Sequence, residues 1–163
     1  MEITAVDVDE TPPADVPAEA LAEFLAVKKA DAYVNALATD QVLITADTTV
    51  VVNGNLLNKP VDAADARRML ALLSGRTHKV FTGVCLRGQQ LRTSFTDIAL
   101  VTFRTLSEAE IDYYVEKYAP LDKAGAYGVQ DWIGYTAVER IEGSFYTVMG
   151  LPMHRVYEAL KRF

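Results

Sequence analysis

Two short apolar runs and the turn that follows them constrain the fold more than any other part of the chain. Residues 42–44 and 50–52 are continuous apolar stretches of the kind expected in buried strands. Asn53-Gly54 follows the second run directly, and this dipeptide is the strongest two-residue signal for a β-hairpin. We therefore expect a strand, a polar edge, a second strand, a tight turn and a returning strand that Pro60 closes.

Asp47 lies between the two runs, where a carboxylate needs a partner. Aspartate is disfavoured inside a strand, and burying an unpaired carboxylate near a core is unfavourable. The partner could be a metal ion, a lysine or a backbone amide, and the returning strand could bring Lys59 close. The alternative is that Asp47 caps a turn together with Thr48, and this stretch alone does not decide between the two.

Composition narrows the class of protein. The 163 residues fit one domain with a sizeable core. A net charge of -6 argues against a general nucleic-acid binder, which would carry a basic patch. Cys85 is the single cysteine, which fits a reducing compartment such as the cytoplasm. There is no leader-like segment and no long apolar run, so we expect neither export nor a membrane partner.

The periodicity of the chain predicts an α/β fold, with a mixed β-sheet flanked by helices. Helices are expected at residues 17–38, 62–74, 107–118 and 154–163. Besides the hairpin, strands are expected at residues 2–8, 80–86, 91–103, 133–141 and 144–148. Ser107 and Glu110 have the spacing of a capping box, and Gly83 inside a strand indicates a bulge or a close backbone approach.

Acidic and basic groups near the N-terminal helix could bind a metal ion or an anion. Asp7, Asp9 and Glu10 offer the hard oxygen ligands that a divalent cation prefers, although spacing alone favours a solvated acidic turn. Lys29 falls next to the buried stripe of its helix, where a snorkelling lysine is the simpler interpretation.

Two later segments carry groups suited to a nucleotide. Residues 121–131 lack helix or strand periodicity, and functional groups tend to lie on such loops. There Lys123 could hold a phosphate and Gln130 could read a base edge, with a structural loop as the alternative. The basic residues at 76, 78 and 79 would also suit phosphate, or form surface charge on an edge strand.

Five ordered motifs resemble those of the Maf-type nucleoside triphosphate pyrophosphatases. They are ADTTVV at residues 46–51, NKP at 58–60, LSGRTH at 73–78, DKAGAYGVQ at 122–130 and GLP at 150–152. Residues 8–10 and 28–30 match as well. Because the resemblance covers essentially the whole chain, we interpret residues 1–163 as one Maf-like domain.

The resemblance implies a fold, an activity and a set of site residues. The family has two lobes around a nucleotide cleft, is usually a cytoplasmic homodimer, and uses Mg²⁺ or Mn²⁺ to hydrolyse nucleotides to monophosphate and pyrophosphate. Gly-Val-Gln at 128–130 is similar to the branch that prefers dTTP and UTP, with modified pyrimidine nucleotides as further candidates. The implied roles are proton acceptor for Asp47, metal ligands for Glu10 and Asp47, phosphate contacts for Lys29, Lys59 and Lys123, and base preference for Thr48 and Gln130.

The chain departs from the family at its start. The resemblance implies an N-terminal Ser-x-Ser-Pro-Arg-Arg segment that supplies an arginine for the phosphates, and nothing in residues 1–163 matches it. We therefore expect a chain truncated relative to the family. The alternative function is a catalytically impaired nucleotide-binding or regulatory protein linked to control of cell division. A 7-methyl-GTP enzyme is a weaker alternative, because Gln130 argues against it.

Overall fold

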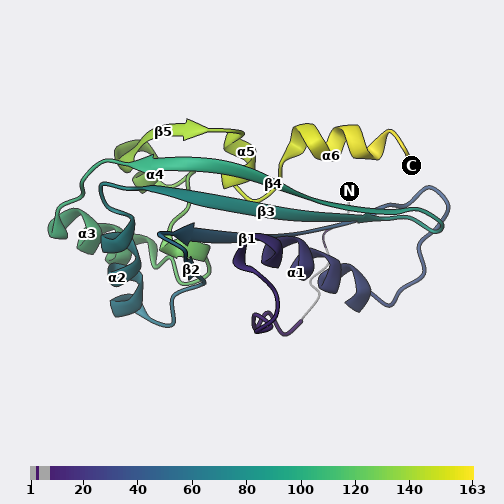
Figure 1. The fold of residues 1–163 in the computed structure, drawn as a ribbon, viewed down its shortest axis with the longest axis horizontal. Helices are drawn as coiled ribbons and strands as arrows, with labels where there is room; N and C mark the ends of the chain where they lie inside the picture. The colour runs from purple at the N-terminus through teal and green to yellow at the C-terminus, as the bar shows by residue number, and fades with distance from the viewer. Residues whose placement is uncertain (1–2, 4–7) are drawn as a thin grey trace.

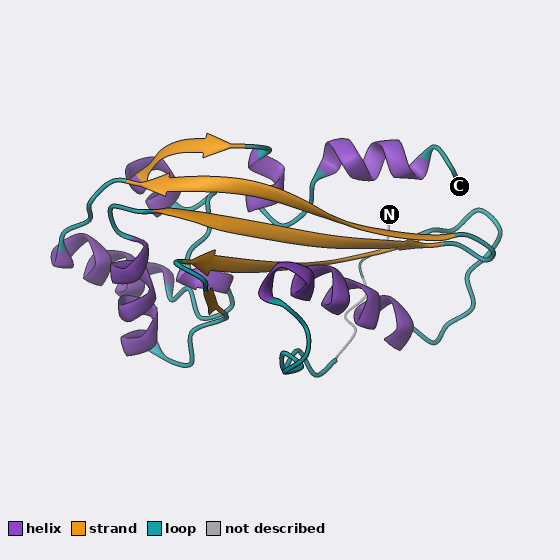
Figure 2. Ribbon diagram, in the orientation of Figure 1, coloured by secondary structure: helices purple, strands orange, loops and turns teal. Residues whose placement is uncertain are grey.

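The centre of the molecule is a five-stranded sheet, seen in a computed structural model that describes residue 3 and residues 8–163 (Figures 1 and 2). The strands lie in the order β2-β1-β3-β4-β5, and every neighbouring pair is antiparallel. The prediction of an α/β fold with a sheet flanked by helices is confirmed, although the sheet is antiparallel throughout and contains no parallel pair among the described strands. The strands are β1 (Leu43–Val52), β2 (Asn55–Leu57), β3 (Thr77–Arg87), β4 (Arg92–Phe103) and β5 (Val138–Glu142).

Helices cover both faces of the sheet and one of its ends. They are α1 (Ala18–Ala32), α2 (Ala63–Leu73), α3 (Glu108–Tyr118), α4 (Trp132–Ala137), α5 (Phe145–Val148) and α6 (Met153–Leu160), with a 3₁₀ turn, η1, at Ala124–Ala126. On β3, α1 packs near Phe81 and Cys85, whereas α6 packs near Val84 and Leu86. Side chains alternate between the faces of a strand, so α1 and α6 lie on opposite faces. The helices α2, α3 and α4 gather at one end of the long strands (Figure 1).

None of the helices in the described part of the chain is both long enough and apolar enough to cross a membrane.

The hairpin predicted from Asn53-Gly54 is present. Both residues have positive φ, 51° and 79°, as a two-residue turn between antiparallel strands requires, and Val52 pairs with Asn55. The two apolar runs before the turn, however, belong to a single strand, because β1 continues through Asp47. The neighbouring strand β3 supplies a ladder partner at every position along this length, so no polar edge separates the runs.

Gly83 allows a close approach between β3 and α1. A Cβ at this position would lie 2.1 Å from the backbone nitrogen of Glu23, so only glycine fits. The predicted close backbone approach is therefore confirmed. Gly83 is the ladder partner of Asp47, and cross-strand partners share one face of a sheet. The contact consequently places α1 beside Asp47.

The helices α2, α3 and α4 form a lobe at one end of the long strands, and this lobe has its own apolar core. Asp62 caps α2, and Ser107 with Glu110 forms the predicted capping box of α3. Buried side chains of these two helices pack with Val80 and Val101 of the sheet. This lobe carries the loop that faces α1 across the edge of β1.

The segment 133–148 differs from the two strands predicted for it, since Trp132–Ala137 and Phe145–Val148 are helices and only Val138–Glu142 is a strand. Ile133 and Ala137 are fully buried and four residues apart, a spacing that suits one face of a helix as well as alternate strand positions. The observed helix packs closely on the preceding loop at Gly134, where a Cβ would lie 1.8 Å from the carbonyl oxygen of Val129.

The first helix is shorter than the predicted 17–38. It ends at Ala32, and Tyr33 has extended backbone. Arg87 donates to the carbonyl oxygen of Tyr33 at 2.7 Å, and Gln89 donates to that of Leu37 at 2.7 Å. The β3–β4 hairpin therefore binds the carbonyl group of Tyr33, which a longer helix would use internally. The predicted strand at residues 2–8 lies almost wholly outside the described residues.

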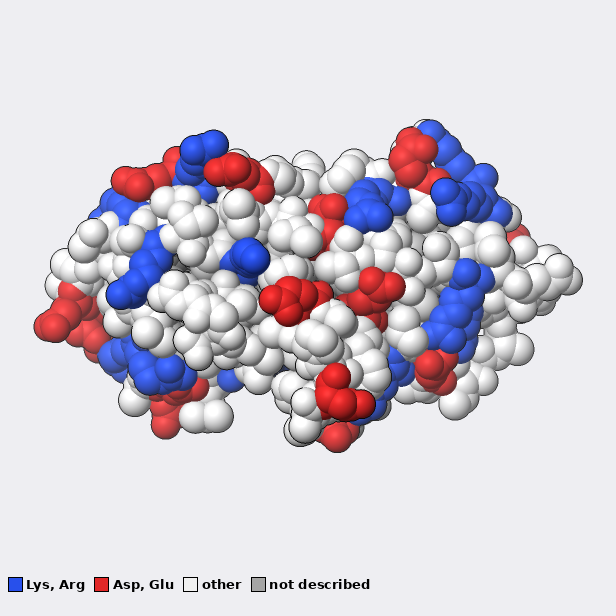
Figure 3. All heavy atoms as spheres, viewed as in Figure 1, with Lys and Arg blue, Asp and Glu red and all other residues white. Residues whose placement is uncertain are grey.

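Surface charge is mixed on the face that Figure 3 shows. Lysine and arginine side chains lie scattered among aspartate and glutamate across both lobes. The net charge of -6 is therefore not gathered into one acidic area on this face. The charges that matter for a ligand are those inside the pocket described next.

Candidate functional site

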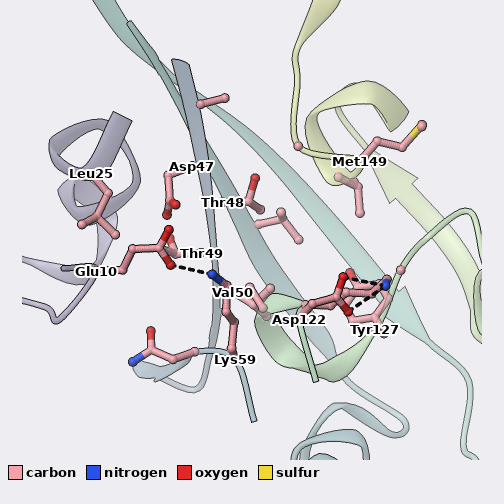
Figure 4. A pocket seen from close by; sticks show the side chains of 18 of the residues that line it. Glu10, Leu25, Asp47, Thr48, Thr49, Val50, Lys59, Asp122, Tyr127 and Met149 are labelled. Carbon is pink, nitrogen blue, oxygen red and sulfur yellow. Dashed lines mark hydrogen bonds and ion pairs between the residues drawn. The ribbon is translucent and has the colours of Figure 1, made fainter. Parts of the chain in front are cut away.

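A pocket of about 560 Å³ lies along the edge of β1, between α1 on one side and the 122–130 loop and α5 on the other (Figure 4). A volume of this size suits a small-molecule ligand. Segments that are far apart in the chain meet here, and the pocket contains every residue predicted for the site. These residues are Glu10, Lys29, Asp47, Thr48, Lys59, Lys123 and Gln130.

Strand β1 divides the pocket into two sides. Successive side chains of a strand point to opposite faces, so Asp47 faces α1 and Thr48 faces α5, as Figure 4 shows. The short strand β2 pairs with β1 only from Val50 onward, so β2 does not cover the edge beside Asp47 and Thr48. A ligand lying across this edge would contact both sides.

Two carboxylates and two lysines meet on the α1 side. Lys29 Nζ lies 2.5 Å from Asp47 Oδ1 and 2.8 Å from Glu10 Oε1. Lys59 Nζ, from the segment after β2, lies 2.5 Å from Glu10 Oε2. Asp47 is thus paired with a lysine inside a strand, and the alternative in which it caps a turn with Thr48 is wrong. Lys29 points into the pocket and not along the helix towards solvent.

Burial and the lysines shift the pKa values of this cluster in different directions. Burial raises the pKa of Asp47 above 3.8, and the hydrogen bond from Lys29 only partly opposes it. Burial also acts to raise the pKa of Glu10, but hydrogen bonds from Lys29 and Lys59 outweigh it and lower that pKa. For Lys29, burial acts to lower the pKa, while the bonds to both carboxylates outweigh it and raise the pKa. The pKa values of the two carboxylates are therefore shifted in opposite directions, upward for Asp47 and downward for Glu10.

A divalent metal ion fits the oxygen atoms on this side. Mg²⁺ is usually held by one or two carboxylates together with substrate phosphates, and Glu10 and Asp47 supply two. Thr49 Oγ1 in the pocket wall is buried and has no hydrogen-bond partner among the described residues. The described part of the chain contains no cluster of three or more His, Cys, Asp or Glu side chains that could hold a metal ion, so phosphate and water would have to complete the shell.

The acidic segment before α1 contributes Glu10 alone to the described site. Asp9 accepts a hydrogen bond from the Thr11 backbone nitrogen at 2.9 Å and does not line the pocket. Asp7 lies outside the described residues. Of the two described members of the predicted group, Glu10 faces the lysines and Asp9 does not line the pocket.

The 121–131 segment forms the opposite wall and is held against the hairpin. Gly125 N donates to Asn58 O at 3.2 Å. Gly125 has a φ of 68°, and a Cβ there would lie 3.1 Å from Val50. Lys123 Nζ pairs with Asp122 at 3.0 Å. The loop that carries Lys123 and Gln130 thus packs on β1 and on the segment that follows β2.

The basic residues at 76, 78 and 79 do not form a phosphate site. None of them lines the pocket. His78 is 1% exposed, its Nε2 hydrogen-bonds with Tyr127 Oη at 2.8 Å, and burial lowers its pKa to about 4. Arg76 donates to the carbonyl oxygen of Leu72 at 2.7 Å, so it binds the end of α2.

Three residues behind Thr48 were missed by sequence reasoning. Thr82 is the ladder partner of Thr48, and Asp97 is the ladder partner of Thr82. Thr147 comes from α5, a segment predicted as a strand. No motif marks these residues, and the only signal that could have found them is the register of the three long strands.

Comparison with known proteins identifies relatives over the whole chain. The family model described as Maf-like protein matches residues 1–163. A protein of Porphyromonas gingivalis (strain ATCC BAA-308 / W83) named dTTP/UTP pyrophosphatase is 51% identical over 159 residues, which are 96% of this chain and 80% of that protein. The family resemblance seen in the motifs is confirmed.

Two further relatives carry the same name. The dTTP/UTP pyrophosphatase of Bacteroides thetaiotaomicron is 51% identical over 159 residues, covering 98% of this chain and 82% of the relative. That of Flavobacterium johnsoniae is 44% identical over 159 residues, with 98% and 82% covered.

Proposed function

Because the chain belongs to the family of Maf-like proteins, we propose that it is a metal-dependent pyrophosphatase that hydrolyses dTTP and UTP to the monophosphate and pyrophosphate. The names of the relatives support the substrates. The observation that carries the proposal is the meeting of Asp47, Glu10, Lys29 and Lys59 at the open edge of β1. Such a cluster combines cations for phosphate with carboxylates for metal and proton transfer.

The lysines are proposed to bind the triphosphate. Phosphoryl transfer is catalysed mainly by positioning and by stabilising charge on the phosphate oxygens. Lys29 and Lys59 are held by Glu10 before a substrate arrives, and Lys123 faces them from the loop across the pocket. A Mg²⁺ or Mn²⁺ ion held by Glu10 and Asp47 would polarise the phosphoryl oxygens.

Asp47 is proposed to accept the proton of the attacking water. Burial raises its pKa, which makes this carboxylate a stronger base than an exposed one. Lys29 fixes one of its oxygens at 2.5 Å and leaves the other available. A general base must lie within hydrogen-bond reach of its water, and a water at the uncovered edge of β1 meets that condition.

Thr48 and Gln130 are proposed to contact the base. Both line the pocket, and Thr48 points to the face of β1 opposite that of Asp47. Modified pyrimidine nucleotides are included among the proposed substrates. A homodimer and a cytoplasmic location stay predictions, and neither nucleic acid nor a membrane is a partner in this proposal.

Pyrophosphate release from dTTP, UTP, CTP and 7-methyl-GTP, measured with Mn²⁺, tests the proposal. We expect turnover of dTTP and UTP above that of the other two nucleotides, and loss of turnover when the metal is chelated. Binding of dTTP or UTP without pyrophosphate release in either Mg²⁺ or Mn²⁺ would contradict the proposal. It would favour the alternative of a nucleotide-binding protein that has lost its chemistry.

A further inference from the structure

A row of polar side chains crosses the sheet behind Thr48. Thr48, Thr82 and Asp97 are ladder partners across β1, β3 and β4, and they share one face. On β3, the residues that flank this row on the same face are Val80 and Val84, each part of an apolar cluster. Polar groups between two apolar clusters destabilise a fold unless they are hydrogen-bonded, so the bonds of this row are informative.

The hydrogen bonds of the row have a fixed direction. Thr82 Oγ1 lies 2.7 Å from the carbonyl oxygen of Thr147, and a carbonyl oxygen can only accept. Thr82 has one hydroxyl hydrogen, which this bond uses. Thr48 Oγ1 lies 2.9 Å from Thr82 Oγ1, so Thr48 must be the donor in that contact. The Thr48 hydroxyl therefore has only lone pairs left to offer to the pocket.

The far end of the row holds this direction in place. Thr147 is fully buried, and its hydroxyl donates to Asp97 Oδ2 at 2.5 Å. Arg155 lies 3.5 Å from the other Asp97 oxygen. The carbonyl oxygen of Thr147 also accepts from Gly150 N at 3.1 Å, but turning the Thr82 hydroxyl away would leave two oxygen atoms 2.7 Å apart with no hydrogen between them, which is unfavourable.

We infer that Thr82 is a positioning residue that makes Thr48 a hydrogen-bond acceptor, and that this acceptor recognises the imide N3–H of uracil and thymine. Cytosine carries a lone pair at N3, which would face the lone pairs of Thr48. Gly150 leaves the hydroxyl open to the pocket, since even a Cβ there would come within 3.3 Å of Thr48 Oγ1. The inference rests on the proposed function, whose substrates it explains by the chemistry of one hydroxyl group.

The test compares kcat and KM for UTP, CTP and 3-methyl-UTP between the unaltered protein and three variants. Thr82→Val keeps the shape of the side chain and frees the Thr48 proton to point into the pocket. We expect the preference for UTP over CTP to fall about tenfold, the effect of one hydrogen bond, mainly through KM. Thr82→Ser retains the hydroxyl and should retain the preference.

Thr45→Val is the matched control. It removes a hydroxyl from β1 that donates to the carbonyl oxygen of Ala26 at 2.6 Å and does not line the pocket. We expect it to leave the UTP-to-CTP preference unchanged. If Thr82→Val does not fold, Thr82→Ala is measured in its place.

An unchanged preference in the variant without the Thr82 hydroxyl overturns the inference while leaving the proposed function intact. Equal turnover of 3-methyl-UTP and UTP by the unaltered protein does the same, because methylation removes the N3–H. Absence of turnover on every nucleotide overturns the proposed function, and the inference with it.

Discussion

The two sides of β1 differ in how their polar groups are balanced. On the Asp47 side, charges neutralise each other, with two lysines bound to two carboxylates. On the Thr48 side, neutral hydroxyl groups form a one-way chain that ends at a carbonyl oxygen. Asp47 and Thr48, which are adjacent in β1, therefore face a charged cluster and a network of neutral hydroxyl groups, respectively.

The difference teaches how one strand could serve two tasks. A charged cluster exchanges partners readily when a polyanion enters, because the lysines can leave Glu10 for phosphate. A directed chain of hydroxyl groups cannot reverse without leaving two buried oxygen atoms in close contact with no hydrogen between them. The first arrangement suits turnover and the second suits selection. The predictions below act on one side at a time.

Replacing Asp47 by asparagine should have the largest effect. The amide side chain would keep the shape of the carboxylate but could not accept a proton, and loss of a general base lowers kcat by about 10²–10⁴-fold. Pyrophosphate release from dTTP measures this, and calorimetric binding of dTTP should change far less. Asp40→Asn, at an exposed position, is the control. Activity of Asp47→Asn within tenfold of the unaltered protein would remove Asp47 from the chemistry.

Lys29→Met should lower turnover by about 10²–10³-fold, the usual loss for one preorganised charge contact. It also leaves Asp47 and Glu10 facing each other without the shared cation, so the melting temperature should fall. Lys28→Met is the control, because Lys28 does not line the pocket and donates to the Asp9 carbonyl oxygen. Equal effects of the two substitutions would show that Lys29 has no special part in the site.

Acid should destabilise the core on the Thr48 face through His78. Burial lowers the pKa of His78 from 6.5 to about 4, so between these values the unfolded chain binds a proton that the folded chain does not. Stability is therefore fully present above pH 6.5 and falls by about 3 kcal/mol as the pH drops towards 4. Chemical denaturation across this range measures the effect. The variant His78→Gln cannot titrate at this position, so its free energy of unfolding should fall less steeply between pH 6.5 and 4. An unchanged fall of the unfolding free energy would exclude His78 as its source.

Gly150→Ala should have the smallest effect and act on the Thr48 side alone. Gly150 has a φ of 104°, and the added Cβ would lie 3.3 Å from Thr48 Oγ1. We expect about 1–3 kcal/mol of backbone strain, together with a few-fold higher KM for UTP at similar kcat. Gly54→Ala is the matched control, since its φ is 79° and nothing lies within 4 Å of the new Cβ. If both variants raise KM equally, crowding of Thr48 is not the cause.

Local signals predicted the parts of the fold that short-range chemistry decides. Asn53-Gly54 requires positive φ at both residues, and Ser107 with Glu110 caps its own helix, so neither depends on distant segments. Residues 133–148 depend on what they pack against. Ile133 and Ala137 suit either a strand or a helix by spacing, and the observed helix packs against Val129 through Gly134, a contact that residue spacing does not reveal.

The candidate site also contains some residues that local sequence motifs predict and others that depend on contacts between distant segments. The residues that line the pocket could be named because they stand in motifs, although only the structure brings Glu10, Lys29 and Asp47 into contact. Thr82 and Thr147 could not be named. Their role depends on strand register and on a one-turn helix docking against β3 and β4, and neither is visible in residue spacing.

The contact at Gly83 has a consequence for how the sequence can diverge. It seats α1 on the sheet by backbone against backbone, and Asp47 is its ladder neighbour. Because no side chain lies between α1 and β3 at Gly83, the distance between Lys29 and Asp47 does not depend on the size of a side chain there. The outward residues of α1 can change in a lineage, or be redesigned, without moving the ammonium group. Position 83 itself should accept no other amino acid, and we expect deep mutational scanning to find it among the least tolerant sites of the chain.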